Sequence, residues 1–261
     1  MLTDQQVVAT TGLDAAALKP AECDISRAAE LPFETVAIDF EGREHVPDRD
    51  TLSLLAADRE VRLTVPVRAD GFDPLGDDEL DAEIPEGVAR VLVAGHPAYL
   101  SDEERDRPVA PRLGAAADRH PDAWVGTESI ERLAMATGQA QFELLSRSTE
   151  REVGALRAAG YDGTVAVYAP TVLTDDPDAV LDSVGTYVAR RGPVAKALPP
   201  ETAADADATG RARDVLLAAA QDYALVGSPE TVRSQVEDLR AAGVDRVVGY
   251  PARGLDAFLG A

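Results

Sequence analysis

The amino-acid sequence predicts an α/β protein that folds as a single-domain (β/α)8 TIM barrel. The chain has 261 residues, a length at which α/β barrels often form one domain. Short apolar runs alternate with helix-like segments, which is typical of βαβ units on a parallel sheet. Eight such runs occur, and "ARVLVAG" and "TVAVYA" are apolar on both faces, as expected of parallel strands that are covered on both sides.

The predicted strands follow one another along the chain, each separated from the next by a helix or a helix-sized gap. An open doubly wound sheet is the alternative, but it usually has fewer strands, and no G-x-G-x-x-G follows any of the runs. The strands are expected over residues 6–13, 35–40, 61–67, 89–95, 123–128, 140–146, 164–170 and 246–252.

Two segments near the C-terminus stand out from this pattern. Residues 199–210 lack bulky apolar side chains, so we predict a low-complexity loop at about 197–212, either solvated or acting as a mobile flap over the mouth of the barrel. In "YALVGSPETVRSQVEDLRAAGVDRVVGYPA", Ser228 is a good N-cap, Pro229 suits the first helical position and Gly243 suits the residue after the helix. That segment therefore predicts a short strand or turn, a capped helix and the last strand.

The chain is strongly acidic. It has 47 Asp and Glu against 25 Lys and Arg, a formal net charge of −22, and the acids are spread along its length. Such a surface repels nucleic acid and anionic membranes, so neither is an expected partner. Lys19 and Lys196 are the only lysines. Dispersed acids with so little lysine resemble halophilic cytoplasmic proteins, in which molar salt screens the self-repulsion; an acidic mesophilic protein is the alternative.

The remaining composition narrows the class of protein. Cys23 is the only cysteine, which excludes an intramolecular disulfide and argues against a cysteine-based metal cluster. No window approaches about eighteen consecutive apolar residues, and the N-terminus has no basic region followed by an apolar stretch. We therefore expect a soluble cytoplasmic protein.

Three segments of the chain have a recognisable pattern: "VGSPETVRSQVEDLRAAGVDRVV", "GTVAVYAPTVLTDDPDAVLDSVGTYVARRG" and, more weakly, "AAELPFETVAIDFEG". They resemble the bacterial luciferase-like monooxygenase family, which includes reductases that depend on the deazaflavin coenzyme F420. The resemblance implies a (β/α)8 barrel, F420 or FMN bound at its C-terminal mouth, and a homodimer formed through the outer helices. Members of the family carry a glycine-rich stretch after the fourth strand, where this chain has "AGHPAYLSDEERDRP".

Residues that follow the strand ends of such a barrel face its catalytic mouth. Asp39, His96 and Glu128 take these positions on the second, fourth and fifth predicted strands, and we predict them as catalytic acid or base groups. The structural alternative is that Asp39 and Glu128 cap helices and that His96 only shapes a turn. His45 and His120 lie in polar connections and are expected to be structural.

Five further residues are candidates for binding a cofactor. Arg147 and Arg253 suit phosphate or carboxylate groups, and the rings of Tyr168 and Tyr250 suit a flat ring system. Thr11 ends the first predicted strand, which a barrel places beside the last strand, so its hydroxyl is expected near Arg253 in an anion site. The alternatives are ion pairs between the arginines and nearby acids, and packing of the tyrosines.

The sequence supports three functions in decreasing order. The first is an F420- or FMN-dependent oxidoreductase that acts on a small molecule. The second is a non-catalytic TIM-barrel binding or scaffold protein that has lost cofactor binding. The third is a cofactor-independent lyase or isomerase that uses His96 and an acid. No metal motif occurs, and a divalent site made of Asp39, Glu41, His96 and Glu128 is only a weak alternative.

Overall fold

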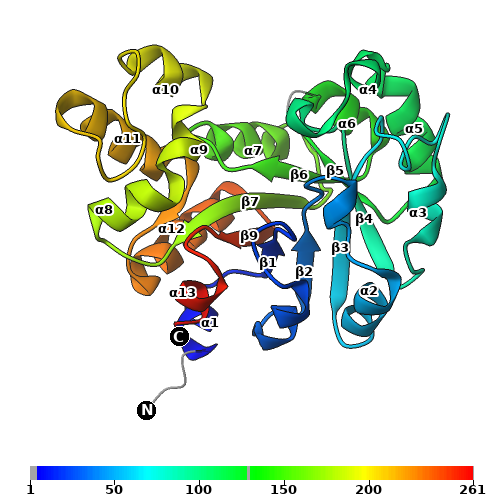
Figure 1. The fold of residues 1–261 in the computed structure, drawn as a ribbon, viewed down its shortest axis with the longest axis horizontal. Coiled ribbons are helices and arrows are strands. Elements are labelled where there is room, and N and C mark those ends of the chain that lie inside the picture. Colours follow the sequence, from blue (N-terminus) through cyan, green and yellow to red (C-terminus); the bar gives the residue numbers. More distant parts are fainter. Residues whose placement is uncertain (1–4, 128–129, 261) are drawn as a thin grey trace. The chain divides into compact units, whose positions relative to one another are not determined.

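A computed structural model describes residues 5–127 and 130–260. Most strands form where the sequence predicts them. The strands are β1 (Ala15–Leu18), β2 (Thr35–Ile38), β3 (Glu60–Pro66), β4 (Val88–Val93), β5 (Trp124–Gly126), β6 (Ala140–Leu144), β7 (Val165–Val172), β8 (Leu225–Val226) and β9 (Arg246–Pro251) (Figure 1).

The strands form a closed ring. Their order in the sheet is β6-β5-β4-β3-β2-β1-β9-β7-β8, and β6 also pairs with β7. Between these two strands, the Gln141 N–H donates to the Thr164 carbonyl at 2.8 Å, and the Leu145 N–H donates to the Tyr168 carbonyl at 2.8 Å. Both bonds step forward by four residues on each strand, as parallel strands require. The predicted (β/α)8 barrel is therefore confirmed, with β9 as its eighth strand.

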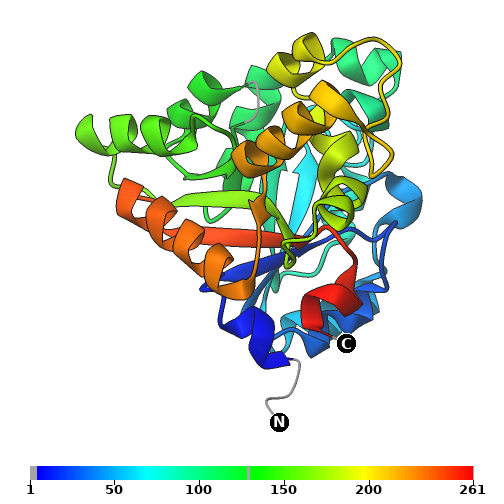
Figure 2. The same ribbon diagram turned by 90° about the vertical axis from the view of Figure 1, so that its left-hand side faces the viewer.

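The prediction for the first strand is wrong. Residues 6–13 form the short helix α1 (Gln5–Ala9) and a turn, and the strand follows as Ala15–Leu18. The run "QVVA" has the β-branched residues that favour strands, but Val8 is buried in α1, which contacts α13 (Leu255–Leu259) (Figures 1 and 2). The alanine-rich strand pairs in parallel with β2 and is fully buried, so tertiary context decides against local propensity here.

The described residues divide into two compact units. We call Asp14–Glu143 with Tyr161–Ala166 the N-terminal unit, and Met1–Leu13, Leu144–Gly160 and Val167–Ala261 the C-terminal unit. Over residues 5–127 and 130–260, no helix has the length and hydropathy that a membrane span requires.

The N-terminal unit holds β1 to β6 and the start of β7. Strand β3 pairs in parallel with β2 on one side and β4 on the other, and these strands are buried along most of their length. Apolar side chains such as Val36, Leu63 and Leu92 are completely covered. The helices are η1 (Ile25–Glu30), η2 (Arg43–His45), α2 (Arg49–Ala56), α3 (Glu79–Glu83), η3 (Pro97–Tyr99), α4 (Asp102–Asp106), α5 (Val109–Arg119) and α6 (Glu131–Thr137).

The C-terminal unit contains the segment predicted to end the fold. Helix α12 (Pro229–Ala242) begins where Ser228 accepts a hydrogen bond from the Thr231 N–H, and it ends at Gly243, whose φ is 109°. Val232, Val236 and Leu239 are its buried face, as predicted. The other helices after β6 are α7 (Thr149–Ala158), α8 (Pro177–Val180), the π-helix η4 (Leu181–Gly185), α9 (Thr186–Ala189), α10 (Gly192–Ala197) and α11 (Gly210–Tyr223).

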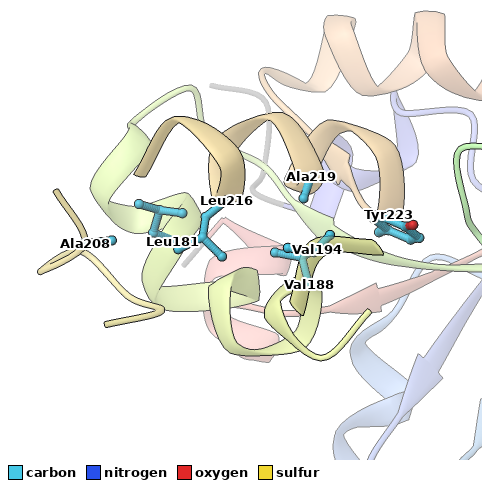
Figure 3. Packing of buried hydrophobic residues seen from close by; sticks show 7 residues of the cluster. All are labelled: Leu181, Val188, Val194, Ala208, Leu216, Ala219 and Tyr223. Atoms are coloured by element: carbon cyan, nitrogen blue, oxygen red, sulfur yellow. The ribbon is translucent and has the colours of Figure 1, made fainter. Parts of the chain in front are cut away.

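Helices η4, α9, α10 and α11 share a hydrophobic cluster in which Leu181, Leu216 and Tyr223 are buried (Figure 3). The predicted low-complexity loop is irregular between α10 and α11, but it is not merely solvated. Ala208 is buried in the same cluster, and a Cβ on Gly185 would lie 2.0 Å from the Ala204 carbonyl oxygen. The small side chains of this segment therefore allow close backbone packing, which its low-complexity composition does not indicate.

Candidate functional site

Ionisable side chains gather at the carboxyl ends of the strands in the N-terminal unit. Lys19 follows β1, Glu41 follows β2, and Tyr99 lies on η3 beyond β4. Glu41 Oε2 accepts a hydrogen bond from the Ala21 N–H at 3.0 Å, and Lys19 Nζ pairs with Glu22 Oε1 at 3.1 Å. We call Lys19, Glu22, Asp39, Glu41 and Tyr99 the carboxyl-end cluster.

The pKa values of two groups in this cluster are raised. Burial raises the pKa of the Glu41 carboxyl, and the Ala21 N–H and the charge of Lys19 offset only part of that effect. Burial also raises the pKa of the Tyr99 phenol, and the nearby carboxylates of Glu41, Glu22 and Asp39 raise it further. Both groups therefore hold a proton more strongly than the same side chains do in water.

Two of the three predicted catalytic residues lie in or beside this cluster. Asp39 is half-buried, and the helix that follows is capped by Gly42, so Asp39 does not cap it. His96 is exposed, and its Nδ1 accepts the Ala98 N–H at 3.1 Å, so it does shape the turn into η3. Its ring centre lies 5.9 Å from that of Tyr99. Glu128, the third predicted residue, lies outside the described residues.

The loop after β4 is held by Arg68. Its guanidinium donates to the carbonyls of Ala94 at 2.8 Å and Gly95 at 3.2 Å, immediately before His96. A third bond reaches the Arg105 carbonyl at 2.7 Å. Burial lowers the pKa of Arg68, and the charge of Arg105 lowers it further. Arg68 thus fixes the backbone that carries His96.

A second network fixes the loop after β3. Arg107 donates to Asp70 Oδ1 at 2.7 Å, and the Asp70 N–H donates to Glu104 Oε1 at 2.7 Å. The buried carboxylate of Asp73 accepts from Arg112 Nε at 2.9 Å. These charges pair with one another, so they hold the loop in place.

The predicted ring-binding residues lie together in the C-terminal unit. The rings of Tyr168 on β7 and Tyr250 on β9 stack with their centres 6.0 Å apart and their planes 12° from parallel. Tyr168 is buried and Tyr250 is partly exposed. The two side chains therefore form one aromatic surface, of which Tyr250 is the more accessible member.

The two predicted anion-binding arginines are exposed. Arg147 follows β6 in a turn where the Ser146 hydroxyl lies 3.0 Å from that of Ser148. Arg253 follows β9 and lines a shallow depression that is open to solvent. Neither arginine makes an ion pair or hydrogen bond with another described residue, so neither is neutralised by an acid of this chain in the described ranges.

Comparison with known proteins places the chain in a family. A family model described as "Family of unknown function (DUF7388)" matches residues 8–258. The chain belongs to the DUF7388 family. No curated protein matches it.

Two solved structures resemble this DUF7388 protein in fold. An F420-dependent secondary alcohol dehydrogenase in complex with an F420-acetone adduct is 12% identical, with a TM-score of 0.63 over 94% of this chain and 95% of that chain. The monooxygenase RslO1 from Streptomyces bottropensis is 19% identical, with a TM-score of 0.53 over 92% of each chain. At these identities the likeness concerns the fold alone.

One predicted site residue is misplaced in this DUF7388 chain. Thr11 precedes β1 rather than ending it, so it lies at the amino end of that strand. It is buried, and its hydroxyl donates to the Val8 carbonyl at 2.6 Å, which closes the turn after α1. The error follows from the wrong first strand.

Sequence reasoning also missed Lys19 and Tyr99. Lys19 does not follow a predicted strand, because the first strand is predicted over residues 6–13 and forms instead at Ala15–Leu18. Tyr99 lies several residues beyond β4, and only the turn at η3 brings it near Glu41. Among the described residues, no group of three or more His, Cys, Asp and Glu side chains could hold a metal ion.

Proposed function

We propose that this protein is an oxidoreductase of the luciferase-like class that binds F420 or a flavin at the carboxyl ends of the barrel strands. The observation that carries the proposal is the carboxyl-end cluster, in which Glu41 and Tyr99 have raised pKa values. Perturbed acids gather at functional sites, and in (β/α)8 barrels the functional end is the carboxyl end of the strands. The fold shared with an F420-dependent dehydrogenase and a monooxygenase supports the class.

The residues of the C-terminal unit suit part of such a cofactor. Arg147 is exposed and has no acidic partner in the described ranges, so it would hold a phosphate or carboxylate group. Tyr250 would lie against a flat ring, with Tyr168 supporting it from behind through their stacked contact. Arg253 would supply a further positive charge.

The segment after β4 does not suit a phosphate. It forms the short helix α4, whose first turn contains Asp102, Glu103 and Glu104. Ser101 and Glu104 close this end with reciprocal hydrogen bonds, so the N–H groups of these two residues are already used. Cofactor phosphates would therefore have to be held elsewhere, and Arg147 is the candidate.

A bound deazaflavin or flavin would supply hydride exchange. The chain would supply proton control. Glu41 holds a proton more strongly than a free carboxyl group, and the Ala21 N–H fixes its Oε2, so it would act as an acid towards a substrate. Asp39 and His96 are the further proton carriers at these strand ends, with Arg68 fixing the backbone before His96.

Direct titration tests the proposal. The purified protein, kept folded in KCl, is titrated with F420 and separately with FMN while the fluorescence of each is followed. We expect one of them to bind saturably, and Arg147→Ala to weaken that binding by about tenfold or more. Arg190→Ala is the matched control, because Arg190 is also exposed and has no partner among the described residues. Absence of binding by both cofactors to folded protein would refute the proposal.

A non-catalytic barrel is the second candidate. The acidic α4, in the place where the luciferase-like family carries glycines, favours it, as does the packing of Tyr168 against Tyr250. It predicts that neither cofactor binds and that Arg147→Ala changes nothing. The same titration therefore separates the two candidates.

We also propose that the chain forms a homodimer, as the resemblance to the luciferase-like family implies. The mass of the chain is 27.5 kDa. Light scattering coupled to size-exclusion chromatography would give about twice that mass for a dimer, and a mass equal to one chain would refute it.

A further inference from the structure

The low-complexity segment between α10 and α11 is docked on the π-helix η4. We call residues 199–209 the strap. The Ala204 carbonyl lies so close to Gly185, the last residue of η4, that a Cβ at that position would overlap it. The Ala206 N–H donates to Asp182 Oδ1, earlier on η4, at 2.9 Å. Both contacts fall on a π-helical turn, a form that is frequent at functional sites.

The strap contributes little apolar surface to this contact. Ala208 is buried in the cluster with Leu181 and Leu216 (Figure 3), and Ala204 packs against the same cluster but is only partly buried. Methyl groups bury much less area than the side chain of a leucine. Glu201 has a φ of 56° and is, in the described part of the chain, the one non-glycine residue in the left-handed region, which is energetically unfavourable. The docked strap is therefore only weakly stabilised.

The charges across this contact mostly repel one another. Asp205 and Asp207 flank the strap residue whose N–H binds Asp182. Asp178 on α8 is joined to the same place, because Arg213 donates to its Oδ1 at 2.6 Å and to the carbonyl of that strap residue at 3.2 Å. All four carboxylates are exposed. Each of the two strap aspartates thus meets two carboxylates and one guanidinium, so repulsion outweighs attraction.

Salt changes the balance between these contributions. Arg211 and Asp214, near the start of α11, carry opposite charges and leave the local excess of acid as it is. Exposed charges interact over about 10 Å in 0.1 M salt but over only about 3 Å in 1 M salt. Molar salt therefore removes most of the repulsion, while the close packing at Gly185 and the burial of Ala208 remain.

We propose that the strap responds to ionic strength: it docks on η4 in molar salt and is released at low ionic strength while the rest of the chain stays folded. Release exposes the part of the cluster around Leu181 and Leu216 that Ala208 covers. The proposal concerns the C-terminal unit alone and is tested without any cofactor, so it does not depend on the redox function.

Hydrogen exchange followed by mass spectrometry tests the proposal on the full chain. KCl is lowered from molar concentration only as far as the amides of α12 stay protected, which shows that the chain is folded. Rates are divided by those of the free strap peptide at the same KCl concentration. We expect exchange in residues 199–209 to become about tenfold faster over this range, because several weak repulsions act together. Strap exchange that does not depend on KCl, or that rises only when α12 also opens, would overturn the proposal.

One variant tests the close packing. Gly185→Ala places a Cβ against the Ala204 carbonyl, so its strap should exchange in molar KCl as fast as the unmodified strap does at low KCl. Gly192→Ala on α10 is the matched control, since a Cβ there meets nothing within 4 Å, and its strap should stay protected in molar KCl. A folded Gly185→Ala protein whose strap is equally protected would overturn the proposal.

A second variant tests the charges and decides the matter if Gly185→Ala does not fold. Asp182→Asn keeps an oxygen that can accept the Ala206 N–H but removes one negative charge. KCl should then change strap exchange by about threefold instead of about tenfold. Asp222→Asn, an exposed acid at the other end of α11, is the control and should behave like the unmodified protein. An unchanged KCl dependence in Asp182→Asn would overturn the proposal.

Discussion

Two carboxyl groups of the N-terminal unit, at opposite ends of its strands, have pKa values shifted in opposite directions. Burial works against the charge of Asp81 on α3, but hydrogen bonds from His120 Nε2 at 2.9 Å and Arg90 Nε at 2.8 Å outweigh it and lower the pKa. At Glu41, burial wins and the pKa is raised. The carboxylate at the amino ends of the strands, Asp81, is thus paired and favours its ionised form. The carboxyl group at the carboxyl ends, Glu41, binds its proton more tightly than a free glutamate does.

Arg62, near the amino end of β3, is also held by partners of its own. Arg62 pairs with Glu60, donates to the Asp122 carbonyl at 3.3 Å, and lies 4.1 Å from the centre of the Trp124 ring. These charged groups lie near the start of β3 and β5. In (β/α)8 barrels that end serves stability and the other end serves function, and the two carboxyl groups fit this division.

The largest expected effect comes from salt. With a net charge of −22, the folded chain repels itself at low ionic strength, and molar KCl screens that repulsion. We expect the thermal midpoint to rise by about 10 °C between low and molar KCl, which corresponds to roughly 3 kcal/mol for a chain of this size. A midpoint that does not change over this range would mean that the acidity is not an adaptation to salt.

The next effect tests the amino-end carboxylate. Asp81→Asn removes the charge that pairs with Arg90 and one of the two oxygens that accept from Arg90 and His120 in a mostly covered site, and breaking a buried ion pair costs about 3 kcal/mol of unfolding free energy. Urea unfolding in KCl measures it. Asp102→Asn is the control, because the Asp102 side chain is 94% exposed. Equal losses in both variants would contradict the assignment. The loss should persist in molar KCl, since buried pairs are screened less.

The difference in unfolding free energy between the unmodified protein and Asp81→Asn should depend on pH in one direction. The pKa of Asp81 is lowered from 3.8 on folding, so its stabilisation is present above 3.8 and is lost as the pH falls through the folded value. The gap between the protein and Asp81→Asn should therefore close only below about pH 4. A gap that closes near neutral pH would point to another group.

The contribution of Glu41 to stability should depend on pH with the opposite sign. Because folding raises the pKa of Glu41 above 4.5, the folded state binds that proton more tightly, and stability falls as the pH rises from 4.5 through the folded value. Glu41→Gln removes this cost and can still accept the Ala21 N–H. We expect a gain within about 0.5 kcal/mol at neutral pH. A loss as large as that of Asp81→Asn would remove the contrast between the two ends.

Seven of the eight barrel strands could be predicted because their short apolar runs indicate burial. "TVAVYAP" combines β-branched residues with no polar face and forms β7, and "VRLTVPV" forms β3 although Arg62 and Thr64 share one of its faces. The first strand was not predicted correctly because "AAAL" has little strand propensity. It becomes a strand only through its pairing with β2. Burial in the barrel, rather than local preference, determines that element.

The sequence predicts where the candidate site lies but not how its groups interact. In a (β/α)8 barrel the site lies at the carboxyl ends of the strands, and Asp39 and His96 could be named because they follow predicted strands. The sequence does not show how far Glu41 is covered, nor that Tyr99 comes near it, because both depend on how the loops after β2 and β4 fold back. A pKa raised by burial is a property of packing between segments distant in sequence.

The smallest expected effect is spectroscopic and concerns the Tyr99 phenol. Burial raises its pKa above 10.0, and the charges of Glu41, Glu22 and Asp39 add to that shift. The chain has six tyrosines, so the absorbance titration of Tyr99→Phe is subtracted from that of the unmodified protein. The difference should show one phenol with a midpoint above 10.0, and the substitution itself should change stability by less than about 1 kcal/mol.

The same titration tests whether this phenol interacts with the carboxylate of Glu41. Glu41→Gln removes one negative charge near Tyr99, so the midpoint of the phenol should move back toward 10.0. Glu44→Gln is the matched control: Glu44 lies on η2, its side chain is 74% exposed, and it should leave the midpoint where it was. Equal midpoints in the two glutamine variants would mean that Glu41 and Tyr99 do not interact, and the carboxyl-end cluster would then not be one site.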